Sequence, residues 1–171
     1  MADKLLERLE REGKVRKQKA GFVQVEALLK EAILDLGEAG KIKHLAERAT
    51  YLLAYMAMLK AGRVLLLMEG FVPDDGAQHK TVVETTGMFL GKKYLDLTAH
   101  FETMRRKRNG LTYGAAILLS KTESGEALED ALAQLVLGQI LVDELPDLDD
   151  EGEVEGEIAE ARDETDEGLR L

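Results

Sequence analysis

Residues 105–108 form a run of four consecutive cations, Arg-Arg-Lys-Arg, in a chain that is acidic overall. Adjacent positive charges repel one another, and the usual reason for gathering them is a phosphate or carboxylate partner. Asn109, Thr112 and Tyr113 follow on the same or an adjacent helical face. A guanidinium, an amide and a hydroxyl placed together could hold the phosphate of a nucleotide or of RNA. The predicted binding residues are Arg105, Arg106, Lys107, Arg108 and Asn109.

A plainer interpretation of the same run stays open. Lys and Arg side chains near a helix C-terminus interact favourably with the negative end of the helix dipole. For Arg105, Arg106 and Lys107 this interpretation is as good as a phosphate partner. Arg108 differs because Asn109 and Tyr113 accompany it. A separate apolar run, from Tyr51 to Met68, is interrupted by two cations, Lys60 and Arg63. These two residues are predicted to face an interface.

The three histidines, His44, His79 and His100, fit no metal pair, because gaps of 35 and 21 residues separate them. His100 lies two helical turns before Arg108, on a similar face, and is the only plausible catalytic histidine. The alternative is a partly buried histidine without a catalytic role. His79 is predicted to cap or solvate a helix N-terminus, and His44 to lie on the surface. With no cysteine, no P-loop and no His-Glu-x-x-His motif, the sequence predicts neither a metal nor a cofactor.

The net charge of −10 is unevenly distributed along the 171 residues. Residues 143–171 hold 14 of the 33 acidic residues and 2 of the 23 basic ones, which leaves residues 1–142 with a charge of +2. The acidic composition therefore does not exclude a polyanionic ligand. The charged N-terminus lacks the apolar core of an export signal, and Lys60 and Arg63 make a membrane span from Tyr51 to Met68 improbable. A cytoplasmic protein without a membrane anchor is predicted.

Apolar residues recur with the helical period and predict an all-α fold, an up-and-down bundle of four main helices with a short extra helix. No stretch alternates with period two, so no strand is predicted. Residues 1–145 are assigned to the bundle, including an N-terminal helix and basic connector at 1–19, and residues 146–171 to a disordered acidic tail with a weak helix at 154–162. The predicted helices are Asp3–Glu12, Phe22–Leu36, Ile42–Glu69, His79–Leu90, Tyr94–Tyr113 and Gly125–Glu144, with a loop at Phe71–Gln78 and Ser124 as a cap.

Together these segments resemble the HEPN superfamily of small helical nucleotide-binding domains over about residues 1 to 145. The resemblance is carried by LLERLEREGK at residues 5–14, AYMA at 54–57, AGRVLLLMEGF at 61–71, QHKTVVE at 78–84, and RKRN at 106–109 followed by Tyr113. In active HEPN ribonucleases an arginine and a polar residue are followed a few positions later by a histidine, and two protomers pair so that both sets line one cleft.

The resemblance implies that Arg108 stands at the arginine, Asn109 at the polar residue and Tyr113 at the histidine. It makes Arg108 and Tyr113 the catalytic candidates of a toxin-type, metal-independent endoribonuclease. Histidine exchanges protons near pH ~6.5, whereas tyrosine does so only near ~10. The substitution therefore supports binding of RNA or a nucleotide with weakened or lost catalysis. A homodimer and an antitoxin-type protein partner are also implied.

A non-enzymatic interaction module is the alternative function. Its helical body would be a dimerisation platform, since Tyr51 to Met68 is more apolar than one bundle face requires and leaves surface for a partner. Its acidic tail would bind another protein or lie over the basic patch and mask it.

Overall fold

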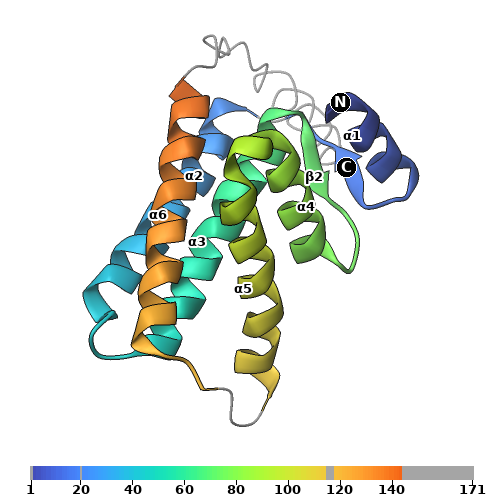
Figure 1. Cartoon of the computed structure of the whole chain (residues 1–171). Helices are drawn as coiled ribbons and strands as arrows, with labels where there is room; N and C mark the ends of the chain where they lie inside the picture. The colour runs from blue at the N-terminus through green and yellow to red at the C-terminus, as the bar shows by residue number, and fades with distance from the viewer. Residues whose placement is uncertain (1, 20, 115–117, 144–171) are drawn as a thin grey trace, which may run out of the picture.

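The most apolar helix, α3 (Glu47–Met68), runs through the middle of the fold (Figure 1). It is long and apolar enough to cross a membrane, but 67% of its most apolar 18-residue segment is buried, which fits the core helix of a soluble protein. Lys60 on this helix pairs with Glu31 and Asp35 at 3.3 and 2.8 Å. Lys60 therefore joins α3 to α2 within one chain and does not face the predicted interface.

The computed structural model describes residues 2–19, 21–114 and 118–143, and these form the predicted all-α bundle. The chain alternates in direction along the four long helices, α2, α3, α5 and α6, while α4 packs beside α3 and α5 (Figure 1). The predicted tail and its weak helix lie outside the described residues. Besides α3, the elements are α1 (Ala2–Arg11), β1 (Val15–Lys17), α2 (Phe22–Ile42), β2 (Phe71–Pro73), α4 (Gln78–Leu90), a 3-10 turn (Lys92–Tyr94), α5 (Leu95–Tyr113) and α6 (Lys121–Asp143).

Each of the six predicted helices is present, but α2 and α3 have other boundaries than predicted. α2 continues through Gly37 and Gly40 to Ile42 instead of ending at Leu36, and α3 begins only at Glu47. A glycine inside a helix costs about 1 kcal/mol relative to alanine. The long contact of α2 with α3 outweighs that cost, because tertiary packing overrides intrinsic propensity.

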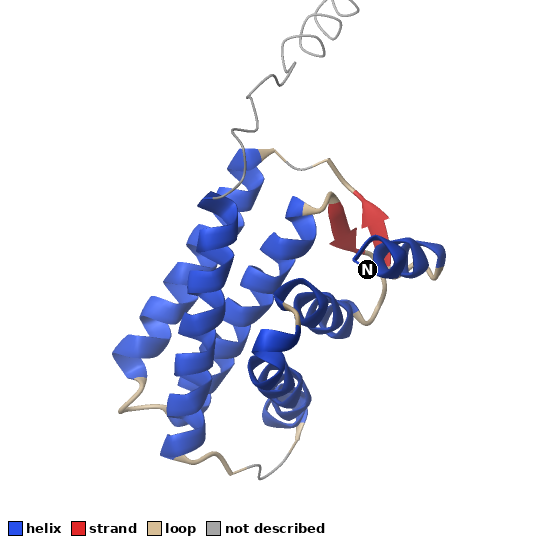
Figure 2. Cartoon of the chain, turned by 45° about the horizontal axis from the view of Figure 1, so that its top comes forward, coloured by secondary structure: helices blue, strands red, loops and turns tan. Residues whose placement is uncertain are grey.

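A small antiparallel sheet of β1 and β2 shows that the prediction of a chain without strands is wrong (Figure 2). Each strand has three residues, too few for a period-two pattern to be visible in the sequence. Gly13 and Gly70 precede the strands with φ values of +66° and +78°, a conformation that glycine adopts most readily. The sheet ties the basic connector to the segment that leads into α4.

The N-terminal cap of α6 is Ser120 and not, as the sequence predicted, Ser124. Oγ of Ser120 accepts the N–H of Glu123 at 3.1 Å, and the Glu123 carboxylate accepts the N–H of Ser120 at 2.9 Å. This reciprocal pair is a capping box. Ser124, the predicted cap, is buried inside the helix. α6 consequently begins at Lys121 and not at Gly125.

Replacing Ser120 by alanine should lower the free energy of unfolding by about 1 kcal/mol, because the N–H of Glu123 loses its acceptor. Thr122→Ala is the matched control, since Thr122 is exposed in the same turn and should leave stability nearly unchanged. Urea denaturation followed by circular dichroism measures both variants. Equal losses in the two would contradict the capping role of Ser120.

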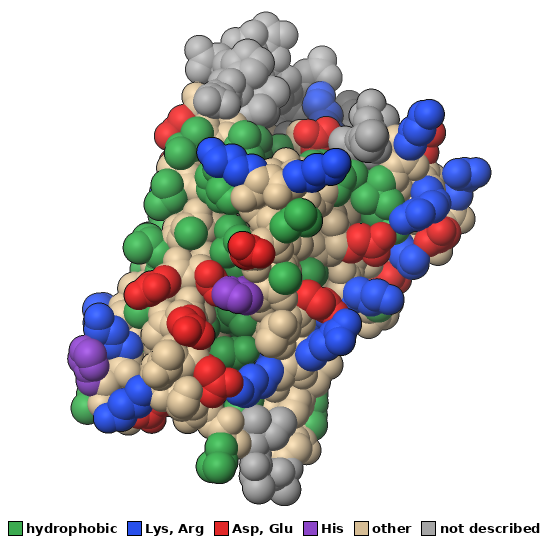
Figure 3. All heavy atoms as spheres, in the orientation of Figure 1, with side chains coloured by type: hydrophobic (Ala, Val, Ile, Leu, Met, Phe, Trp, Pro, Cys, Tyr) green, Lys and Arg blue, Asp and Glu red, His purple; other side chains and the backbone are tan. Residues whose placement is uncertain are grey.

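An exposed apolar face lies on α6, whereas the sequence predicted one on α3. Helices α2, α4, α5 and α6 cover α3, so its apolar residues are used within one chain. On α6, Leu132, Val136 and Ile140 recur at every fourth position and are 54%, 50% and 47% exposed. Figure 3 shows hydrophobic side chains along this edge of the molecule.

Candidate functional site

The α5 helix distributes the four consecutive cations over different faces, since successive helical residues are rotated by about 100°. Arg105 and Arg106 both bind Glu102, with Nε–oxygen distances of 2.7 Å. These hydrogen bonds, chiefly that of Arg105, lower the pKa of Glu102 to about 2. Lys107 turns to α6 and pairs with Glu123, so three of the four cations have a carboxylate partner.

Arg108 has a different environment from the three cations before it. In the described part of the chain its guanidinium has no carboxylate partner and donates to Oδ1 of Asn109 at 3.2 Å. It also lies 5.9 Å from the centre of the Tyr113 ring, which is 80% exposed. Arg48 of α3 donates to the carbonyl of Leu111 and holds this end of α5. Arg108 therefore presents an uncompensated positive charge at a fixed place.

A hollow of about 450 Å³ lies between α5 and the start of α4, here called the α4–α5 hollow. Arg105, Arg108 and Asn109 line it from α5, and residues 75–80 line it from the other side. Tyr113 is not among its lining residues but adjoins it through Arg108. Of the predicted site residues, the fold thus brings two arginines and one amide to a single concave surface. Arg106 and Lys107 lie outside it.

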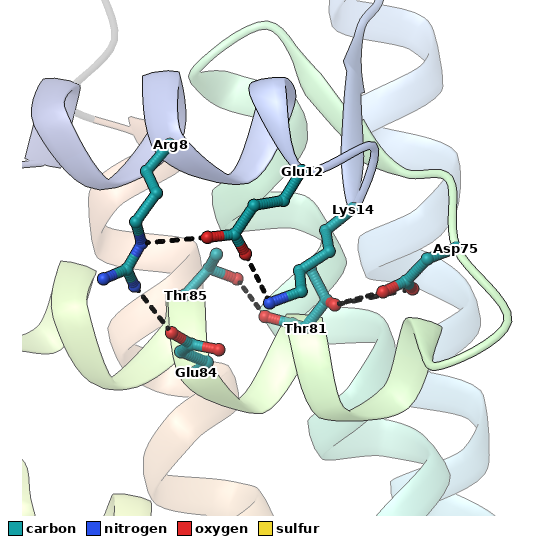
Figure 4. Close-up of polar contacts among 7 residues, drawn as sticks. All are labelled: Arg8, Glu12, Lys14, Asp75, Thr81, Glu84 and Thr85. Carbon is teal, nitrogen blue, oxygen red and sulfur yellow. Dashed lines mark hydrogen bonds and ion pairs between the residues drawn. The ribbon is translucent and has the colours of Figure 1, made fainter.

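The wall opposite the arginines is held in place by hydrogen bonds and ion pairs (Figure 4). Asp75 accepts the N–H of Ala77 at 3.1 Å and the hydroxyl of Thr81 at 3.3 Å, and so ties the loop before α4 to the first turn of the helix. Across the outer face of α4, Arg8 of α1 pairs with Glu84 at 3.3 Å. These contacts join α4 to the loop before it and to α1.

His79 lies in this first turn, and Tyr55 of α3 orients its ring. The Tyr55 hydroxyl lies 2.8 Å from Nδ1 of His79. Burial raises the pKa of Tyr55 to about 12, so the hydroxyl stays protonated and can donate a hydrogen bond to Nδ1. We assign this hydrogen bond as donated by the hydroxyl to Nδ1, which places the proton of the neutral imidazole on Nε2. His79 lines the hollow as a neutral hydrogen-bond donor.

Three arginines surround His79 with positive charge. Burial lowers the pKa of His79 most, and the charges of Arg108, Arg63 and Arg105 lower it further. The imidazole is therefore neutral at pH 7 while its surroundings are positive. An anion is the ligand that such a charge distribution attracts.

His79 is the candidate residue whose position the sequence prediction missed. It lies at a helix N-terminus, as predicted, but its side chain does not cap the helix, and its Nδ1 lies 2.8 Å from the Tyr55 hydroxyl. In the sequence His79 and Arg108 are 29 residues apart. The packing of α4 against α5 brings them together, and no local motif signals it.

His100 does not face the α4–α5 hollow, so the prediction that it shares a face with Arg108 is wrong. Eight residues separate the two in the sequence, which rotates them by about 80° on a helix. Nδ1 of His100 lies 3.0 Å from Oδ2 of Asp130 on α6. His100 is exposed there, and burial raises the pKa of Asp130.

Among the described residues, no three histidine or carboxylate side chains are placed to hold a metal ion. Neither a model of a protein family nor a curated protein matches this chain. The functional assignment therefore depends on the residues of the site.

Proposed function

We propose that this chain is a cytoplasmic protein that binds the phosphate of RNA or of a nucleotide in the α4–α5 hollow. One observation carries the proposal: His79 and Arg108 line the same hollow, together with Arg105, and Arg108 has no carboxylate partner among the described residues. The resemblance to HEPN domains supports the same ligand, because it assigns Arg108 and Asn109 to the polar residues of that family's motif.

Each group in the hollow has a role in holding the phosphate. The guanidinium of Arg108 donates two parallel hydrogen bonds to phosphate oxygens. The Asn109 amide positions that guanidinium and adds a donor, and Nε2–H of His79 donates from the opposite wall. Arg105 adds positive charge that Glu102 partly offsets. Arg106 and Lys107 lie outside the hollow and act only through longer-range attraction.

Binding is a better-supported function than cleavage. Metal-independent cleavage needs a base that takes the proton of a 2′-hydroxyl. A phenol hydroxyl is a poor proton acceptor at neutral pH, so Tyr113 is ill suited to that role. Nδ1 of His79 is already engaged by Tyr55. We therefore propose a HEPN-type homodimer with weakened or lost ribonuclease activity, in which Arg108 and Tyr113 are the residues that any remaining activity would use.

A non-enzymatic interaction module is the second candidate, and the exposed apolar residues of α6 favour it. In that case the bundle would pair with another copy or with an antitoxin-type protein, and the acidic tail would bind or mask a surface. Substituting Arg108 distinguishes the two candidates, because a module without a phosphate site has no RNA affinity to lose.

Binding of a nucleotide should raise the pKa of His79. In the free protein, burial and three arginines favour the neutral ring, whereas a phosphate stabilises the imidazolium. The complex then holds more protons than the free protein, so affinity should rise as the pH falls between the bound and free pKa values. The ring proton shifts of His79, measured by NMR against pH with and without adenosine 5′-monophosphate, test this expectation.

Two variants serve as controls for this titration. His100→Ala removes a histidine outside the hollow and should leave the shift of His79 unchanged. His79→Gln keeps a donor but cannot titrate, so it should remove the part of the pH dependence that comes from His79 and leave the part that comes from the nucleotide phosphate, whose second pKa is about 6. A His79 pKa that stays the same at saturating nucleotide would contradict a phosphate site in the hollow.

A further inference from the structure

A second hollow, of about 250 Å³, adjoins the α4–α5 hollow, and Gln78 lines both. It lies over β2 and between α2 and α3, and its wall is largely apolar. Its apolar lining residues are Leu28, Leu67, Val72 and Pro73. A ligand held at Arg108 can therefore extend past Gln78 onto an apolar surface.

Arg63 lies between the two hollows. It lines the second hollow, and its charge also lowers the pKa of His79 in the first. One of its terminal nitrogens donates to Oε1 of Gln78 at 3.3 Å. Its Nε is buried and has no acceptor among the described residues. This Nε is closed to solvent, so a ligand in the second hollow would bond to Arg63 through its terminal nitrogens.

The polar groups of the second hollow fit the edge of a nucleobase better than a second phosphate. Arg16 at the rim already pairs with Asp74 at 3.2 Å, so its charge is offset. The Gln78 amide and the Arg63 guanidinium are planar groups that pair with the donors and acceptors of a base edge. The apolar wall suits the face of a base, whereas a phosphate would lose hydration against it.

We propose that the ligand is a nucleotide unit that spans both hollows, with its phosphate at Arg108 and His79 and its base in the second hollow against Val72 and beside Gln78. This proposal rests on the phosphate-binding function proposed above. It adds that recognition depends on the base and not on the phosphate alone.

Calorimetric titrations with ribose 5-phosphate, pyrophosphate and the four nucleoside 5′-monophosphates test the proposal. A base held in a protein site should strengthen binding about tenfold or more over ribose 5-phosphate. If ribose 5-phosphate binds as tightly as every nucleotide, the base site is overturned while the phosphate site stands. Pyrophosphate binding more tightly than any nucleotide would also overturn it, in favour of a second phosphate. Absence of binding by all of them would instead overturn the proposed function.

Two variants separate the hollows. Gln78→Ala should remove most of the preference for a nucleotide over ribose 5-phosphate, because the amide beside the base is lost. Val72→Trp fills the second hollow and should also remove that preference, on a strand where an aromatic residue is tolerated. Val72 lies outside the α4–α5 hollow, so this variant should leave the affinity for ribose 5-phosphate within about twofold. Gln139→Ala on α6 is the matched control and should change neither affinity. An unchanged nucleotide preference in both Gln78→Ala and Val72→Trp would overturn the proposal.

A short RNA tells whether the nucleotide unit belongs to a strand. If the unit is part of RNA, a trinucleotide should bind more tightly than its monophosphates and lose its base preference in Val72→Trp. If the unit is a free nucleotide, the trinucleotide should bind no more tightly. Base dependence that Val72→Trp removes supports the proposal in both cases.

Discussion

The Arg108→Ala variant should bind a short single-stranded RNA about 10- to 100-fold more weakly than the unaltered protein at low salt. Hydrogen bonds to charged groups contribute about 1.5–3 kcal/mol, which corresponds to this range at about 1.4 kcal/mol per tenfold change. Arg108 has no carboxylate partner among the described residues and lines the α4–α5 hollow. Its loss therefore removes a direct phosphate contact.

Salt dependence shows whether that contact is to a phosphate. The slope of log affinity against log salt concentration should become less negative by about 0.7 when one phosphate contact to a single strand is lost. Fluorescence anisotropy of a labelled RNA over a series of salt concentrations measures both the affinity and the slope. A variant with weaker binding and an unchanged slope would contradict a phosphate contact.

Arg106→Ala is the matched control, because it removes the same charge from the same helix. Arg106 is exposed, shares Glu102 with Arg105 and lies outside the hollow. It should weaken RNA binding by no more than about threefold, as expected for a screened surface charge. Equal losses in Arg106→Ala and Arg108→Ala would show diffuse attraction to the cationic run and would contradict a specific site.

Gly62→Ala should lower the free energy of unfolding by about 1–3 kcal/mol, as expected for overpacking a core. A Cβ atom at Gly62 of α3 would lie 2.5 Å from Oγ1 of Thr86 and 2.7 Å from Cγ1 of Val82, both on α4. Both side chains are buried, so they cannot move aside freely. The added methyl group would press α4 away from α3 and thereby disturb the contact between His79 and Tyr55.

Gly37→Ala is the control for Gly62→Ala, with the same substitution inside a helix. Apart from its chain neighbours and the local helix backbone, no heavy atom lies within 4 Å of the Cβ position at Gly37. Alanine should raise stability there by about 0.5–1 kcal/mol, because it restricts the unfolded chain more than glycine does. Urea denaturation of both variants measures the difference. Loss of stability in both, or in neither, would contradict the close approach of α3 and α4 at Gly62.

The helices of this protein could be predicted from its sequence because each depends on a local pattern. The period of apolar residues located six helices, and Gly70 and Gly91 mark the ends of α3 and α4. The two strands could not be predicted in the same way, since three residues carry no period. Their pairing joins Val15 to Pro73, far apart in the chain, and depends on the fold as a whole.

The candidate site also has a part that follows from local sequence and a part that depends on the tertiary structure. Arg108, Asn109 and Tyr113 lie within about one and a half helical turns, so the sequence alone determined that their side chains would be neighbours. It could also place Glu102 one turn before Arg105 and Arg106. These relations follow from the geometry of one helix.

Only the tertiary structure decided that His79, Tyr55 and Arg63 join Arg108, and that Lys107 turns instead to Glu123 on α6. A helical period determines which side chains share a face. Which other helix covers that face depends on how the side chains of all the helices pack together. For that reason the sequence predicted the importance of Arg108 but not the presence of the neutral His79 imidazole opposite it.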